Sequence, residues 1–215
     1  MKTIEQIFGA KKIVPTATIE DTDSALKTAE ALLNAGINVM TIRILSQKSL
    51  RSLEKIAKEM PEMSVGAAGI MDAAGFFNSS LAGAKFISSP GITPELITAA
   101  RTRYNDAHFL PGGVVPSHIM EILSRGLDVI NLFPAVAFNG EELLDVYAHA
   151  FPNAKFSVVG GITFENMERY LVKKNVVAVG MSRICSRSLI ETHNFAEITR
   201  LAKTAVDITN KILKI

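Results

Sequence analysis

Eight short apolar segments, each followed by a segment of helical periodicity, constrain the fold of this chain more than any other feature. Most of them carry too few polar residues for one face to lie in water, as is typical of strands covered on both faces. Strands that alternate with helices pair in parallel, because each helix returns the chain to the edge where the previous strand began. The predicted strands cover residues 12–18, 38–44, 63–67, 84–88, 107–110, 128–133, 155–159 and 176–180.

The segments between the predicted strands carry the start signals of helices. Thr93 precedes a proline, so its hydroxyl can cap a helix while the proline takes the first helical position. Pro116 marks another start, and apolar residues recur in residues 24–33 near a period of about 3.6. We also expect a leading helix over residues 4–8 and a final helix over residues 195–213.

Eight β/α pairs in 215 residues predict an α/β protein with a single (β/α)8 barrel, which takes up residues 1–215 as one domain. An open doubly wound sheet usually has fewer strands. No linker-like tract, charge block or low-complexity stretch marks a second domain. Chemistry in such barrels takes place at the C-terminal ends of the strands, so each polar residue can be assigned to the functional or the structural end.

The composition excludes several classes of protein. Hydrophobic residues make up 48% of the chain, which supplies a core and argues against disorder. The net charge of +2 argues against a protein that coats nucleic acid. The sequence shows neither a run of ~20 apolar residues that could span a membrane nor a secretory signal, and Cys185 is its single cysteine. We therefore expect a mature, soluble, cytoplasmic protein.

Glycines directly follow three of the predicted strands. Gly112 comes after the fifth strand, Gly160 and Gly161 after the seventh, and Gly180 with Ser182 after the eighth. Glycine lets backbone N–H groups approach an anion closely, and a following helix adds its positive N-terminal end. Barrels often build a phosphate site from the loops after strands seven and eight. The pattern predicts a phosphate site at these residues, although tight turns between strand and helix would use the same glycines.

Five short motifs together resemble one enzyme family. They are Val-Gly-Ala at 65–67, Ser-Pro-Gly-Ile-Thr at 89–93, Leu-Pro-Gly at 110–112, Leu-Phe-Pro-Ala at 132–135 and Gly-Gly-Ile at 160–162. In this order and spacing they resemble the 2-keto-3-deoxy-6-phosphogluconate (KDPG) and 4-hydroxy-2-oxoglutarate (KHG) aldolases over nearly the whole chain. The resemblance implies a (β/α)8 barrel, usually a homotrimer, that cleaves a 2-keto acid to pyruvate and an aldehyde through a lysine Schiff base.

The residues at the positions of the family's catalytic groups differ here. The Schiff-base lysine corresponds to Asn131, whose amide nitrogen cannot form an iminium because its lone pair is delocalised into the carbonyl. The glutamate that shuttles protons corresponds to Thr41, and the arginine that holds the substrate carboxylate corresponds to Leu45. Two threonines of the family correspond to Gly69 and Val159. The resemblance therefore implies a barrel in which five positions no longer carry the catalytic or substrate-binding side chains of the family.

A displaced lysine can form an imine only if it reaches the C-terminal mouth of the barrel. Three lysines stand at strand starts, at the opposite end: Lys12, Lys85 and Lys155. A strand of five residues separates the two ends by more than ~15 Å, which a lysine side chain does not span. Lys48 lies just beyond the second strand and is the one lysine near the right rim, but we favour a solvated position at a helix start for it.

A metal-dependent or cofactor-dependent mechanism finds little support in the sequence. The four histidines share no ligand spacing. Asp21 and Asp72 lie in loops after strands, where helix capping accounts for them. We therefore expect neither a metal nor a cofactor.

Arg43 is the unusual residue of the second strand. Side chains alternate across a strand, so if Thr41 points into the barrel, Arg43 does too, two residues closer to the mouth. A buried guanidinium needs an anion as its partner. We predict that Arg43 holds a substrate carboxylate, with an alignment slip or a salt bridge to Glu20 as the alternatives. Arg183 either neutralises a phosphate or faces solvent.

These observations leave four functions open. The first is a family barrel that binds a phosphorylated or carboxylated small molecule, with Schiff-base cleavage lost or very weak. The second is an active aldolase that uses a displaced lysine such as Lys48. The third is an isomerase or epimerase that polarises an enediolate with Arg43, Ser88 and Asn131. The fourth is a regulatory or structural subunit that uses the barrel for assembly. We favour the first, with a small molecule as its partner and neither nucleic acid nor membrane.

Overall fold

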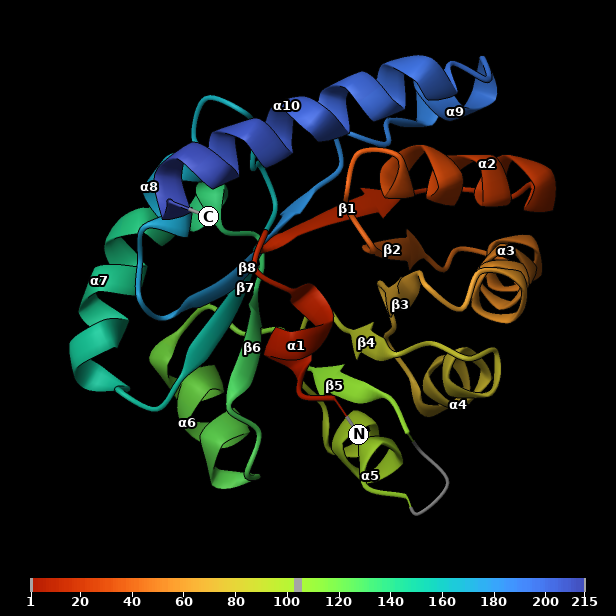
Figure 1. Ribbon diagram of the computed structural model, residues 1–215. Coiled ribbons are helices and arrows are strands. Elements are labelled where there is room, and N and C mark those ends of the chain that lie inside the picture. The colour runs from red at the N-terminus through yellow and green to blue at the C-terminus, as the bar shows by residue number, and fades with distance from the viewer. Residues whose placement is uncertain (1, 103–105, 215) are drawn as a thin grey trace.

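The computed structural model describes residues 2–102 and 106–214 and shows parallel strands that alternate with helices (Figure 1). The strands are β1 (Ile13–Ala17), β2 (Val39–Arg43), β3 (Ser64–Ala68), β4 (Phe86–Ser88), β5 (His108–Leu110), β6 (Val129–Leu132), β7 (Lys155–Val159) and β8 (Val176–Met181). The helices are α1 (Ile4–Phe8), α2 (Thr22–Leu33), α3 (Gln47–Glu59), α4 (Ala73–Leu81), α5 (Pro94–Ala100), α6 (Pro116–Ser124), the 3-10 turn η1 (Val136–Phe138), α7 (Gly140–Ala150), α8 (Met167–Leu171), α9 (Arg187–Glu191) and α10 (Phe195–Leu213). All eight predicted strands are confirmed.

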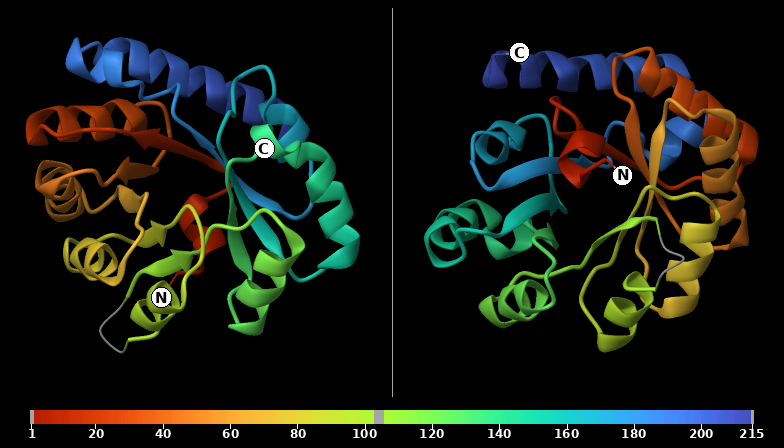
Figure 2. Two further views of the ribbon diagram at one scale, coloured as in Figure 1. Left: turned by 180° about the vertical axis from the view of Figure 1, so that it is seen from behind. Right: turned by 60° about the horizontal axis from the view of Figure 1, so that its bottom comes forward.

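The strands form one sheet that curves into a nearly closed barrel. They pair in the order β5-β4-β3-β2-β1-β8-β7-β6, so β5 and β6 are its two edges. The edges meet where Asn131 N donates to Pro111 O at 2.9 Å and Gly113 N donates to Asn131 O at 3.1 Å. The predicted (β/α)8 fold is confirmed, and its seam lies between β5 and β6, as the view from behind in Figure 2 also shows.

Helix α1 lies across the end of the barrel at which the strands begin (Figures 1 and 2). Phe8, the last residue of this helix, is buried and meets the ring of Phe86 edge to face, with 5.2 Å between the ring centroids. The two rings close the barrel interior from below. The other helices surround the sheet, and α10 packs against α2 and α8.

The helix start signals found in the sequence are confirmed. Thr93, Asp21 and Asp72 each accept a hydrogen bond from the backbone N–H three residues further on, at 3.2, 2.7 and 2.7 Å. Such caps satisfy backbone donors that have no partner inside the helix. The leading and final helices occupy the predicted residues. No helix in the described part of the chain is both long and apolar enough to cross a bilayer.

The close approach of β3 to Phe86 shapes the interior of the barrel. A methyl group placed on Gly66 would lie 2.4 Å from the ring of Phe86, far inside van der Waals contact. A residue without a side chain at this position therefore allows the ring of Phe86 to fill the interior.

We expect Gly66→Ala to lower the free energy of unfolding by about 1–3 kcal/mol, because the added methyl group forces the ring and the strand apart. Gly91→Ala is the matched control, since a methyl group there would have no atom within 4 Å. Urea unfolding measures both variants. Equal stability of the two would show that the interior accommodates the methyl group without strain.

Candidate functional site

A cavity of about 240 Å³ occupies the barrel interior. It opens at the C-terminal ends of the strands, because Arg43, Ser88 and Val159 in its lining are the last residues of β2, β4 and β7. Phe8 and Phe86 form its apolar floor. The volume lies below the ~300–1,000 Å³ of most ligand pockets, so the cavity suits a small molecule. Its polar lining consists of Thr16, Thr41, Arg43, Ser88, Ser89, Asn131 and Ser157.

Thr41 and Arg43 both line the cavity, as the alternation along β2 predicts. Thr41 is 4% exposed, whereas Arg43 is exposed at the mouth, so the expectation of a buried guanidinium is wrong. Arg43 is the last residue of β2, and its side chain extends past the barrel layer that covers Thr41. It forms no salt bridge within the described residues, and Glu20 instead accepts a hydrogen bond from the Ser46 hydroxyl at 2.7 Å. Arg43 is thus the one charged group in the cavity lining and is available to an anion.

Asn131 on β6 is 6% exposed and also lines the cavity. Its Nδ2 donates to Ser89 O at 3.0 Å, across the seam of the barrel. Ser89 is itself held by its hydroxyl, which donates to Gly91 O at 2.5 Å and accepts from Gly112 N at 3.3 Å. The side chain of Asn131 is therefore held by the loop that follows β4.

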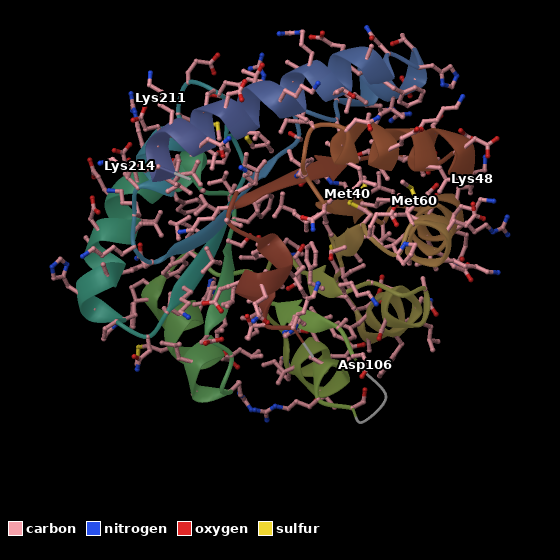
Figure 3. All side chains as sticks on the ribbon, in the orientation of Figure 1. Met40, Lys48, Met60, Asp106, Lys211 and Lys214 are labelled. Carbon is pink, nitrogen blue, oxygen red and sulfur yellow. The ribbon has the colours of Figure 1, made fainter. Side chains whose placement is uncertain are left out.

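The cavity lining contains no lysine. Lys155 opens β7 and pairs with Glu5 of α1, which raises the pKa of the lysine, and Lys12 Nζ donates to Val176 O at 3.0 Å. Lys85 directly precedes β4, also at the start of its strand. Lys48 is exposed on α3 and lies on the outside of the barrel in Figure 3. The predicted placement of the strand-start lysines is confirmed, and Lys48 does not reach the cavity.

The cysteine and the histidines also lie away from the cavity. Cys185 is 1% exposed, and burial raises the pKa of its thiol. His108 Nε2 lies 2.7 Å from Lys2 O, and His193 Nδ1 lies 3.5 Å from the Ser24 hydroxyl. No group of three or more His, Cys, Asp or Glu side chains within residues 2–102 and 106–214 has the geometry of a metal site.

The paired glycines after β7 have backbone conformations that favour glycine. Gly160 and Gly161 have φ values of +101° and +86°. A methyl group on Gly161 would lie 2.7 Å from Val136 Cβ, so the loop packs closely on η1. The helices that follow β7 and β8 are only five residues long and begin at Met167 and Arg187. Residues 162–166 and 183–186 therefore separate Gly161 and Ser182 from the next helix, and the phosphate site at these residues stays a prediction.

The other glycines predicted for phosphate have structural explanations. Gly112 N already donates to Gly91 O at 3.2 Å, and a methyl group at Gly112 would lie 2.2 Å from the Pro90 carbonyl carbon. Gly112 therefore allows the backbone to pack closely against Pro90, and its N–H is already hydrogen-bonded and so is not free for an anion. Gly180 lies within β8 and lines the cavity, and Ser182 is exposed in the turn after β8.

The structure brings together only some of the positions that the family resemblance selects. Thr41, Gly69, Asn131 and Val159 line the cavity, whereas Leu45 is 62% exposed and lines a separate groove. Further lining residues were not predicted as site residues, among them Phe8, Thr16, Ser89 and Ser157. The alternation of inward side chains along β1 and β7 could have revealed Thr16 and Ser157. Phe8 lines the cavity only because α1 folds across the barrel end.

Comparison with known proteins supports the resemblance found in the sequence. Residues 4–201 match the family model described as KDPG and KHG aldolase. The chain is 32% identical over 202 residues to a 2-dehydro-3-deoxy-phosphogluconate aldolase of Dickeya dadantii, covering 94% of both chains. It is 30% identical over 203 residues to the KHG/KDPG aldolase of Escherichia coli K12, again covering 94% of both.

Solved structures show the same architecture. KDPG aldolase from Legionella pneumophila, with pyruvate captured as a covalent carbinolamine, superposes with a TM-score of 0.90 at 32% identity and covers 95% of this chain and 98% of its own. KDPG aldolase of Zymomonas mobilis with 3-phosphoglycerate superposes with a TM-score of 0.86 at 31% identity, with 95% of each chain covered.

We expect Ser89→Ala to lower the free energy of unfolding by about 1–2 kcal/mol, because the buried hydroxyl bridges two backbone groups beside the seam. Ser124→Ala is the control, since that exposed hydroxyl donates only to Glu121 O in its own helix. Thermal and urea unfolding compare the two. A Ser89→Ala protein no less stable than the control would show that this hydroxyl does not support the seam.

Proposed function

Because the chain belongs to the KDPG and KHG aldolase family, we propose that it is an aldolase-family barrel that binds a carboxylated or phosphorylated small molecule and has lost cleavage through a lysine imine. The observation that carries this proposal is the cavity lining, which contains one arginine and no lysine. The proposal concerns this chain alone, since its relatives are named as aldolases.

The loss of imine chemistry follows from the groups that face the cavity. A Schiff base forms when a primary amine attacks the ketone carbon and water leaves. Asn131 stands at the lysine position, and its amide nitrogen is committed to Ser89 O. The cavity lining also contains no carboxylate that could move a proton, since Thr41 stands at the glutamate position. The cavity lining therefore has no side chain for covalent catalysis and none for acid–base catalysis.

Binding can survive this loss, because Arg43 lies at the mouth and forms no salt bridge with any described residue. A guanidinium holds a carboxylate with two parallel hydrogen bonds. For a phosphorylated ligand, we assign the phosphate to the rim formed by Gly160, Gly161 and Ser182, with Gly180 at its edge. Gly160, Gly161 and Ser182 lie in the loops after β7 and β8, and Gly180 lies near the end of β8.

An isomerase or epimerase is the second candidate, because Arg43, Ser88 and Asn131 do line one cavity. Such an enzyme would exchange a carbon-bound hydrogen of its ligand with solvent. Incorporation of deuterium from D2O into a carboxylated ligand would favour this candidate over simple binding.

By family resemblance we also propose that the chain forms a homotrimer. Apolar side chains exposed on and beside α4 are available for assembly: Met71, Phe77 and Leu81, at 72%, 38% and 84% exposure. Elution as a pure monomer in size-exclusion chromatography would contradict the trimer.

We expect no pyruvyl adduct when the protein is incubated with pyruvate and borohydride, because no amine reaches the cavity. Intact-mass spectrometry measures the adduct, and a family aldolase that retains its lysine is the positive control. An adduct on the wild-type chain would overturn the proposed loss of imine chemistry, and peptide mapping would then identify the lysine, with Lys48 as the first residue to inspect.

The double variant Asn131→Lys with Thr41→Glu restores the amine and the carboxylate at the matched positions. We expect it to give a borohydride-stable pyruvyl adduct, since both residues line the cavity. Thr41→Glu alone is the control and should give none. If the folded double variant gives no adduct either, the correspondence of Asn131 to the family's lysine is wrong.

We expect Arg43→Gln to weaken the binding of carboxylate ligands by ~10- to 100-fold, the range for loss of a hydrogen bond to a charged group. Arg51→Gln, on the exposed face of α3, is the control. Isothermal titration calorimetry measures both. Unchanged affinity in Arg43→Gln would show that the carboxylate binds elsewhere.

A further inference from the structure

Three polar atoms in the cavity have no partner within the described residues. They are Thr41 Oγ1, Ser157 Oγ and Asn131 Oδ1, and their residues are 4%, 5% and 6% exposed. Asn131 Nδ2 is hydrogen-bonded, but no hydrogen bond reaches its oxygen. These atoms face the cavity, where water can reach them, so a ligand that displaces that water binds best when it replaces the hydrogen bonds that the water made.

The orientation of the Asn131 amide follows from chemistry. Ser89 O is a carbonyl oxygen and can only accept a hydrogen bond, so the atom 3.0 Å from it must be the nitrogen of the amide. The amide oxygen is then the free atom on the cavity side. This oxygen can only accept, and it therefore requires a donor from the ligand.

Few ligand groups can supply that donor. A ketone, a carboxylate and a fully ionised phosphate carry no hydrogen to donate. An ammonium group does, but the cavity lining has no acidic side chain to balance it and has Arg43 at its mouth. An alcohol fits, because it can donate to Asn131 Oδ1 while it accepts from the hydroxyl of Thr41 or Ser157.

The other features of the cavity limit the rest of the ligand. Arg43 is the one charge in the lining, which matches a single carboxylate. The small volume and the floor of Phe8 and Phe86 suit a short carbon chain whose far end is apolar.

From this geometry we infer that the ligand is a short hydroxycarboxylic acid, with its carboxylate at Arg43 and an alcohol group donating to Asn131 Oδ1. The inference rests on the proposed function, because it assigns the ligand class of the same cavity. It also gives Asn131 a positive role: at this position the protein selects an alcohol over a ketone.

Matched acids that differ only in this group test the inference. The probes are lactate against pyruvate and 2-hydroxybutyrate against 2-oxobutyrate, with binding measured by calorimetry and by ligand-observed NMR. We expect each hydroxy acid to bind the wild-type protein about tenfold more tightly than its oxo partner, the effect of one unpaired buried acceptor. If no hydroxy acid binds, or if the oxo acids bind as tightly, the inference is overturned.

Two variants at Asn131 separate the acceptor from other effects. Asn131→Leu removes the acceptor oxygen. The affinity for each hydroxy acid should then be about the same as the affinity for its oxo partner. Asn131→Gln keeps both an amide oxygen that can accept from the ligand and an amide nitrogen that can donate to Ser89 O, so the preference for the alcohol should persist, and this variant also serves if Asn131→Leu does not fold. Asn34→Leu, at the exposed end of α2, is the control and should retain the wild-type ratio. A wild-type ratio in Asn131→Leu, or loss of preference in Asn131→Gln, would overturn the inference.

The outcomes also distinguish this inference from the proposed function. If oxo and hydroxy acids bind alike and Arg43→Gln weakens both, the carboxylate site stands and only the selection of an alcohol fails. If no carboxylate or phosphorylated acid binds and Arg43→Gln changes nothing, the proposed function fails together with the inference.

Discussion

The contact between the two edge strands at Asn131 is the interaction on which the site depends. The barrel is one sheet with edges at β5 and β6, and the backbone of Asn131 joins them through Pro111 and Gly113. Its side chain adds a bond to Ser89 O beyond β4. The same residue thus joins the two edges of the barrel and lines the cavity, so a substitution of its side chain changes a contact across the seam and the cavity lining together.

The groups that line the cavity limit the ligands that it can bind. Its lining offers hydroxyls, one amide and one guanidinium, all of which bind neutral or anionic oxygen atoms. None of these groups is a primary amine or a carboxylate, so the lining has nothing that forms an imine or moves a proton. Such a cavity can select a ligand by hydrogen-bond complementarity even where covalent catalysis is lost.

The fold could be predicted well because its signals are local. Apolar runs identify the strands, and side-chain caps such as Thr93 and Asp72 act within one turn of helix. The site could be predicted only in part. Alternation along β2 placed Thr41 and Arg43 inside the barrel, but the exposure of Arg43 depends on how far its strand end extends past the neighbouring loops. The roles of Gly112 and Phe8 depend on Pro90 and Phe86, which are distant in sequence.

By itself, the sequence determined the eight-stranded barrel and the family, because hydrophobic periodicity and residue identity are properties of the chain alone. Only the tertiary structure decided which polar atoms lack partners. Whether Asn131 Oδ1 or the hydroxyls of Thr41 and Ser157 are paired depends on the separation of atoms on different strands, which barrel closure sets and which no spacing along the chain encodes.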